Sequence, residues 1–155
     1  MITEATIEQT IDYYENDQKA FIDALAKIME TQPALLAFLS QESIDILLEE
    51  EKDILWYIVL VVYTSINNSD EQIAEITDVN LSKNEENNWT LYQDQARGSF
   101  REKITAFFEG YHQEDLLAFV EDTLEIEDDS PITAVGREVI FITSKSIIDT
   151  LLPLN

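Results

Sequence analysis

Hydrophobic residues recur at helical spacing in the first segment of the chain. Between Thr6 and Glu30 the apolar positions lie three, four or seven residues apart: Ile7, Ile11, Tyr14, Phe21, Leu25 and Ile28. This is the period of a helix that buries one stripe, and Thr6 with Gln9 forms the capping-box pattern of a helix start. The pattern predicts one long helix from Thr6 to about Glu30, with Pro33 in the first turn of the next helix.

The most apolar stretch is ILWYIVLVVY, from Ile54 to Tyr63, which contains no charged residue. A membrane-spanning helix needs about 20 apolar residues, and this stretch meets Asp53 on one side and Asn67 on the other. A buried parallel strand would need further runs of this kind at βαβ spacing, and the chain supplies none as clear. Extended to Ile66, the stretch predicts the central helix of the fold, apolar on all sides and preceded by acids that favour a helix N-terminus.

Caps and polar loops divide the second half of the chain into further helical segments. Residues Ile73 to Ile76 predict a single helical turn, and Ser82 with Glu85 predicts the start of a long helix. The apolar stripe of that long helix contains Trp89, Tyr92, Ala96, Phe100, Ile104, Phe107 and Tyr111. A short helix is expected from Leu116 to Leu124.

A last helix is expected to start at Ser130 and Pro131 and to stop before Pro153. The whole chain contains three glycines and three prolines, too few for the frequent turns of an all-β domain. Its 155 residues, 45% of them hydrophobic, suit one domain with a substantial core. We therefore predict an all-α, single-domain bundle over residues 1–155, with six or seven helices around the helix 54–66.

The charge of the chain narrows its range of functions. The 32 acidic and 9 basic residues give a net charge of −23, which argues against binding to nucleic acid or to an anionic membrane surface, since both need a basic face. The absence of cysteine excludes disulfides and thiolate metal sites. With an N-terminus, MITEATIEQT, that lacks the pattern of a secretory signal, these features predict a cytoplasmic protein.

Two metal-binding patterns are incomplete. Glu109 and His112 have the Glu-x-x-His spacing of helical di-iron sites, but the chain has no second histidine for the other half of such a site. Gly110 indicates a helix end at this point. Asp78, Asn80 and Ser82 match the first ligand positions of a calcium loop, whose required glycine and bidentate glutamate are missing. We therefore expect no metal or other cofactor.

Paired carboxylates suggest an enzymatic alternative. Asp12 with Glu15, and Glu42 with Asp45, have the spacing that could hold Mg²⁺ against a nucleotide, as in all-α nucleotide pyrophosphohydrolases. The chain contains six acidic pairs with this spacing, and its composition alone predicts about six. The spacing therefore favours solvated helix faces over a catalytic site.

Basic residues gather at one place. Arg97, Arg101 and Lys103 are three of the nine positive charges, and Arg97 and Arg101 are expected on one helix face. One interpretation is a pocket for an anionic ligand beside Trp89. The other, which the acidic composition favours, is that the arginines neutralise acids on neighbouring helices.

The surplus of negative charge predicts a function in binding. A charge of −23 exceeds what solubility needs and costs the folded state self-repulsion. We therefore predict a non-enzymatic interaction protein, immunity-, inhibitor- or adaptor-like, that captures a basic protein partner, with Glu49, Glu50 and Glu51 as a candidate contact surface. Salt adaptation is a further explanation of the acidity. The sequence leaves the oligomeric state open, a homodimer included.

Overall fold

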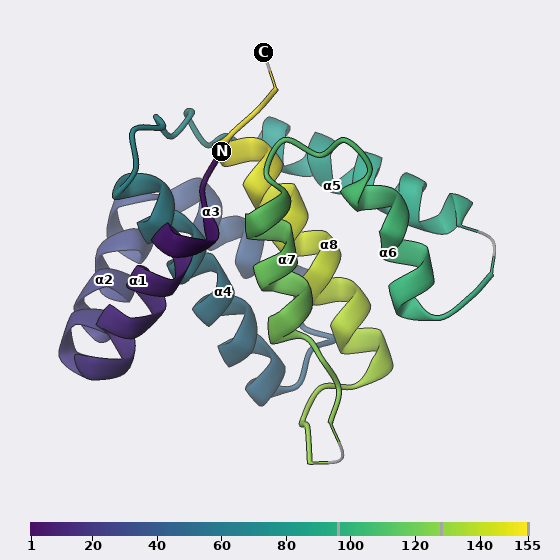
Figure 1. Ribbon diagram of the computed structural model, residues 1–155, viewed down its shortest axis with the longest axis horizontal. Coiled ribbons are helices and arrows are strands. Elements are labelled where there is room, and N and C mark those ends of the chain that lie inside the picture. Colours follow the sequence, from purple (N-terminus) through teal and green to yellow (C-terminus); the bar gives the residue numbers. More distant parts are fainter. Residues whose placement is uncertain (96, 128, 155) are drawn as a thin grey trace.

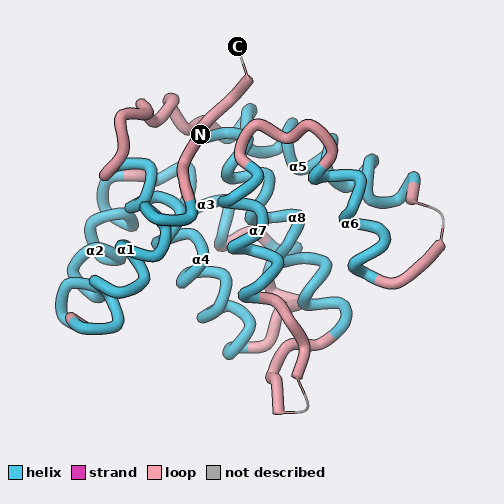
Figure 2. The backbone as a smooth tube through the Cα atoms, in the orientation of Figure 1, coloured by secondary structure: helices cyan, strands magenta, loops and turns pink. Residues whose placement is uncertain are grey.

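The computed structural model describes residues 1–95, 97–127 and 129–154. In these ranges the chain forms eight α-helices, one 3₁₀ turn and no strand (Figures 1 and 2). The elements are α1 (Glu4–Asn16), α2 (Gln18–Thr31), α3 (Pro33–Leu39), η1 (Glu42–Ile44), α4 (Glu49–Asn67), α5 (Asp78–Asp94), α6 (Phe100–Phe108), α7 (Glu114–Thr123) and α8 (Ala134–Leu151). The prediction of an all-α fold is confirmed. Ala96, which the pattern places in the long stripe, lies outside the described residues.

Helices α4 and α8 pack against each other at the centre of the fold (Figure 1). In α4, Leu55 and residues 58–62 are buried, which confirms that the stretch from Ile54 to Ile66 belongs to the core. Helix α8 shares this central position, because every residue from Ile140 to Ile148 is buried. Its hydropathy does not reveal this, since the buried run includes the polar residues 143–146.

The predicted helix from Thr6 to Glu30 is in fact two helices, α1 and α2, which separate at Asp17. This residue leaves the helical conformation, with φ −146° and ψ 85°, and its side chain accepts a hydrogen bond from the Ala20 amide at 3.0 Å. Thr3, rather than Thr6, caps α1. The Asp17 side chain satisfies a backbone N–H group that is left without a helical partner at the start of α2. The predicted helix therefore ends early, and a second helix starts after Asp17.

The predicted helix from Ser82 to Tyr111 is divided as well, into α5 and α6. Thr77, rather than Ser82, caps α5. Helix α6 starts afresh at Ser99, whose side chain forms a capping box with Glu102. A second cap within an apparently continuous stripe again marks the break, so the count rises from six or seven helices to eight.

Two other boundaries differ from the sequence pattern. Residues Ile73 to Ile76 are not helical, and the Ala74 amide donates to the Leu151 carbonyl oxygen at 3.0 Å, which ties this segment to the end of α8. Helix α8 starts after its cap, Thr133, three residues later than Ser130. It ends at Leu151, before Pro153, as predicted.

The packing of the helices defines two separate polar regions. Helix α1 packs against α4 and α7, and α5 packs along α8. One polar region lies between α1 and α7, and the other lies between α5 and α8.

Both chain ends reach the same end of the molecule, where Met1 and Pro153 line one cavity (Figure 1). In the described ranges, no helix combines the length and the apolar character needed to cross a membrane.

Candidate functional site

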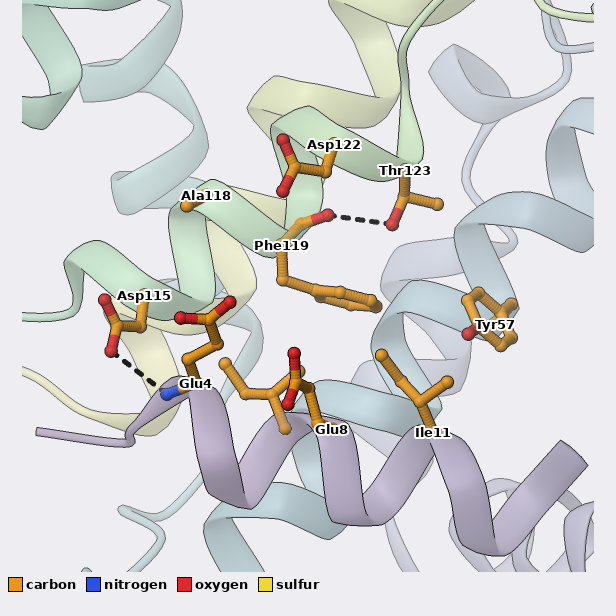
Figure 3. A pocket seen from close by; sticks show the side chains of 10 residues that line it. Glu4, Glu8, Ile11, Tyr57, Asp115, Ala118, Phe119, Asp122 and Thr123 are labelled. Atoms are coloured by element: carbon orange, nitrogen blue, oxygen red, sulfur yellow. Dashed lines mark hydrogen bonds between the residues drawn. The ribbon is translucent and has the colours of Figure 1, made fainter.

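A groove lies between α1 and α7 (Figure 3) and has a volume of about 370 Å³. Its floor is apolar and contains Ile7, Ile11, Tyr57, Ala118 and Phe119. Its rims carry four carboxylates, Glu4 and Glu8 from α1 and Asp115 and Asp122 from α7. The groove therefore combines an apolar floor with a negative border.

Helical spacing explains why each wall carries both kinds of side chain. On α1, Glu4 and Glu8 are one turn apart and border the stripe that buries Ile7. On α7, Asp115 and Asp122 are two turns apart, and Phe119 lies between them in the sequence. Figure 3 shows Phe119 directed from α7 toward α1, with the rim carboxylates around it.

Two hydrogen bonds hold the start of α1 beside α7. The Ile2 amide donates to Oε1 of the buried Gln113 at 3.0 Å, and the Glu4 amide donates to Oδ2 of Asp115 at 3.0 Å. Asp115 thereby places a negative charge at a helix N-terminus, where the helix dipole favours it. Both contacts join residues 111 positions apart in the sequence, so the groove exists only in the folded chain.

Aromatic rings support the floor of the groove. The ring centroids of Phe119 and Tyr57 are 6.2 Å apart, and those of Tyr57 and Phe21 are 6.4 Å apart. Burial, and to a smaller extent the charge of Glu15, raises the pKa of Tyr57, which keeps its hydroxyl neutral. Phe119 remains partly exposed, so the groove offers an aromatic surface to a ligand.

The rim carboxylates form no ion pair with a residue of the described ranges. Ion pairs there join the Met1 amino group to Glu71, Lys52 to Asp45 and Glu49, and Lys145 to Asp149. None of these involves a carboxylate of the groove. Because no ion pair neutralises them, the four rim carboxylates add a local negative potential, which salt screens.

A second polar region, between α5 and α8, is built differently. The Lys145 ammonium donates to Asp149 at 2.8 Å and to the side-chain oxygen of Asn88 at 3.0 Å. Asp149 also accepts from Nδ2 of the Asn88 side chain at 3.0 Å and from the Tyr111 hydroxyl at 2.5 Å. Burial, followed by the charge of Asp149, raises the pKa of Tyr111, so its hydroxyl remains a donor. Each charged group here has protein partners, which indicates a structural role.

The three glutamates of the candidate contact surface, at the start of α4, differ in burial. Glu49 and Glu50 are exposed, but Glu51 is only 1% exposed. The Glu51 carboxylate accepts hydrogen bonds from the Leu48 amide and from the amide and hydroxyl of Thr133, each at 2.9 Å. The expectation that the three glutamates form one exposed surface is therefore wrong for Glu51, because its carboxylate links the starts of α4 and α8.

The proposed anion pocket is not assembled as expected. Trp89 packs edge-on against Tyr92, with ring centroids 6.0 Å apart. Arg97 lies between α5 and α6, whereas Arg101 lies in the first turn of α6, so the expectation that they share a helix face is wrong. Arg101 instead lines a hollow with Glu121 of α7. Burial raises the pKa of Glu121 and the Arg101 charge partly offsets this rise, which favours acid neutralisation.

The carboxylates of the enzymatic alternative are exposed on two separate elements. Asp12 and Glu15 lie on α1, and Glu42 and Asp45 lie at η1, where Asp45 pairs with Lys52 at 3.5 Å. Among the described residues, no group of three or more metal-ligating side chains is placed to hold a metal ion.

The remaining metal patterns lie in ordinary helix ends. Helix α6 ends at Phe108, and Gly110 follows with a left-handed φ of +66°, which confirms the predicted helix end. Nε2 of His112 forms a hydrogen bond of 2.7 Å with the Leu152 carbonyl oxygen. The three residues considered for a calcium loop lie in the first turns of α5: Asp78, Asn80 and Ser82.

Comparison with protein-family models, curated proteins and solved structures finds no match for this chain. The candidate site therefore rests on geometry. The sequence does contain a partial indication of it, because Glu4 and Glu8 flank Ile7 and because Asp115 and Asp122 flank Phe119. These patterns mark acidic borders on two amphipathic helices. They do not indicate that the two helices are neighbours, which is why sequence reasoning missed the groove.

Proposed function

We propose that this protein is a non-enzymatic binding protein, immunity-, inhibitor- or adaptor-like, that captures a basic macromolecular partner in the cytoplasm. The observation that carries the proposal is the small number of acidic side chains that form an ion pair with a basic group. Of 32 acidic residues, four form ion pairs within the described ranges: Asp45, Glu49, Glu71 and Asp149. The remaining charge repels itself in the folded state, and a cationic partner would offset that repulsion.

The same charge favours rapid association with such a partner. A surface of one sign steers an oppositely charged protein into encounter and raises its association rate well above the neutral baseline. Nucleic acids and anionic membranes carry the charge of the protein itself and are repelled. The proposal thus predicts association rates that fall steeply as the ionic strength rises.

The test compares binding with catalysis. The protein is immobilised and exposed to lysate of its source cell at low salt, and retained proteins are eluted by a salt gradient and identified. In parallel, nucleotides are screened for hydrolysis with Mg²⁺ and Mn²⁺. We expect specific retention of a basic protein and no hydrolysis. Turnover that Glu42→Gln abolishes, with no basic protein retained, would instead establish the enzymatic alternative.

A further inference from the structure

We infer that the α1–α7 groove is the docking site and that its occupant is a basic amphipathic helix of the partner, an inference that rests on the proposed function. The partner helix places one large apolar side chain over Phe119. It carries lysine or arginine one turn before and one turn after that side chain. Recognition is thus of the helix-in-groove type, in which a few anchors on one helix face provide the contacts.

The floor of the groove accounts for the apolar anchor. Phe119 and Ile11 are partly exposed, and Ala118, with its small side chain, leaves room above the wall of α7. The volume of about 370 Å³ lies near the lower end of the range for ligand pockets, about 300–1,000 Å³. Such a space suits one large side chain better than an extended cluster. A bare cation would leave the aromatic floor in contact with water.

The rim accounts for the position of the basic residues. Asp115 and Phe119 are four residues apart on α7, or about 6 Å along the helix axis, and Asp122 is seven residues from Asp115, or about 10 Å. A helix alongside α7 presents its own residues i, i+4 and i+7 at the same rises. A cation, an anchor and a second cation at these positions would therefore face Asp115, Phe119 and Asp122. Glu4 and Glu8 add negative charge on the opposite wall.

Charge complementarity also selects against other occupants. A second copy of this chain would bring a further net charge of −23 to a groove that is already bordered by four carboxylates. An apolar helix without cations would bury carboxylates beside uncharged groups, and this desolvation is costly. A helix that carries both an apolar anchor and cations fits the groove best. Its anchor covers the partly exposed aromatic floor, and its cations pair with the rim carboxylates.

The probe is a synthetic alanine-rich helix, acetylated and amidated, with one tryptophan and a lysine one turn to each side. One matched peptide replaces the tryptophan with alanine, and another moves both lysines to the opposite helix face. Affinities are measured by calorimetry at low ionic strength. Since the anchor buries a large apolar surface, we expect the tryptophan peptide to bind about tenfold more tightly than the alanine peptide. Moving the lysines should also weaken binding.

Two pairs of protein variants localise the binding. Ala118→Lys places a long cationic side chain in the groove, and Ala26→Lys makes the same change on the exposed surface of α2. Glu8→Gln with Asp122→Asn removes two rim charges, and Glu86→Gln with Asp94→Asn removes the same charges from exposed positions on α5. Circular dichroism verifies that each variant is folded. Only Ala118→Lys should abolish the preference for tryptophan, and the rim pair should weaken binding more than the α5 pair.

The outcomes separate this inference from the proposed function. A tryptophan preference that Ala118→Lys removes and Ala26→Lys retains supports docking in the groove. Equal binding of the tryptophan and alanine peptides, or equal effects of the two lysine variants, overturns it and indicates attraction by charge alone. Absence of binding by all three peptides also overturns it. None of these results decides whether a basic protein is retained from lysate, which remains the separate test of the proposed function.

Discussion

Acidic side chains meet two opposite environments in this protein, the α5–α8 interface and the groove between α1 and α7. At the interface, Asp149 accepts hydrogen bonds from Lys145, Asn88 and Tyr111. In the groove, the carboxylates of Glu4, Glu8, Asp115 and Asp122 border an apolar floor and form no ion pair with a described residue. The first region uses a carboxylate to complete an interior, and the second leaves its carboxylates without an ion-pair partner, although Asp115 also accepts from the Glu4 amide.

This difference shows that neither the number nor the spacing of acids identifies their role. A buried carboxylate with its hydrogen bonds satisfied adds specificity to packing but little net stability, because desolvation opposes the Coulombic attraction. An exposed carboxylate without a cation contributes mainly to the surrounding electrostatic potential. The comparison therefore makes opposite predictions for the two regions: substitutions should affect folding at the interface and association in the groove.

The largest effect is expected at the α5–α8 interface. Lys145→Met removes the ammonium and leaves Asp149 as a mostly buried charge without its cation. Removing one partner of a buried ion pair costs about 3–5 kcal/mol, and we expect a loss near 3 kcal/mol because Asp149 keeps two other donors. Urea unfolding measures the change.

The matched control removes both charges. Lys145→Met combined with Asp149→Leu should recover most of the lost stability, since an apolar replacement of a buried ion pair is often neutral. If the single variant changed the free energy of unfolding by less than about 0.5 kcal/mol, the interface would not depend on the pair. The contrast with the groove would then disappear.

The next effect concerns two glutamates in the first turn of α4. Glu51→Ala removes the acceptor of three hydrogen bonds from Leu48 and Thr133, and leaving buried donors unsatisfied costs about 1–3 kcal/mol. Glu49→Ala changes an exposed residue two positions earlier and should alter stability by no more than about 0.5 kcal/mol. Thermal unfolding of both variants compares a buried with an exposed acid in one helix turn. Equal losses would contradict the assignment of Glu51 to the interior.

Gly136 provides a second test of the buried position of Glu51. A Cβ atom at residue 136 would lie 1.6 Å from Oε2 of Glu51. Gly136→Ala should therefore destabilise the unsubstituted protein. In the Glu51→Ala background the obstruction is gone, and the same substitution should stabilise α8 by up to about 1 kcal/mol through its higher helix propensity. A double-mutant cycle measures this change of sign.

The sequence predicted the helical fold and much of the core, for reasons that lie in local patterns. The run from Ile54 to Ile66 is apolar on all sides, and burial is the only stable environment for it. The breaks at Asp17 and before Ser99 were missed because the apolar period continues across them, while capping side chains decide where each helix starts. Buried Lys145 was missed for a different reason: its partners, Asn88 and Asp149, are assigned only by tertiary packing.

The groove was beyond the reach of the sequence for the same physical reason. Local spacing places Glu8 beside the stripe of α1 and Asp122 beside Phe119, but their proximity depends on contacts between segments 111 residues apart. Glu51 shows the opposite error. Its neighbours in the sequence are exposed acids, and only the approach of Thr133 makes it an interior residue.

Two partly buried glutamates should make the free energy of unfolding depend on pH. Burial raises the pKa of Glu85, against an opposing hydrogen bond from Gln41, and burial also raises the pKa of Glu121. At pH values between the ordinary pKa of 4.5 and these raised pKa values, the folded state therefore binds more protons than the unfolded state. By linkage, stability should rise as the pH falls from about 7 toward about 5.

Thermal unfolding at low ionic strength measures this dependence. Glu85→Gln and Glu121→Gln should each flatten the profile, because the substituted side chain does not titrate. Glu86→Gln, at an exposed position beside Glu85, should leave the profile largely unchanged. A melting temperature that stayed constant or fell over this pH range would contradict the expected sign.

The smallest effect on stability is expected in the groove. Glu8→Gln with Asp122→Asn removes two exposed charges that form no ion pair with a described residue, so the free energy of unfolding should change by no more than about 0.5 kcal/mol. The association rate with the lysine–tryptophan peptide should nevertheless fall. Stopped-flow fluorescence at two ionic strengths distinguishes this groove pair from the control pair Glu86→Gln and Asp94→Asn on α5.

The ionic strength decides between a local and a global role for the rim charges. At about 0.01 M salt the screening length is about 30 Å, and both pairs of substitutions should slow association because the whole surface attracts the peptide. At about 0.1 M it is about 10 Å, so only charges close to the docked peptide still contribute. The groove pair should then remain slow relative to the unsubstituted protein, while the α5 pair recovers. Equal recovery of both pairs would mean that the groove is no more important than any other acidic part of the surface.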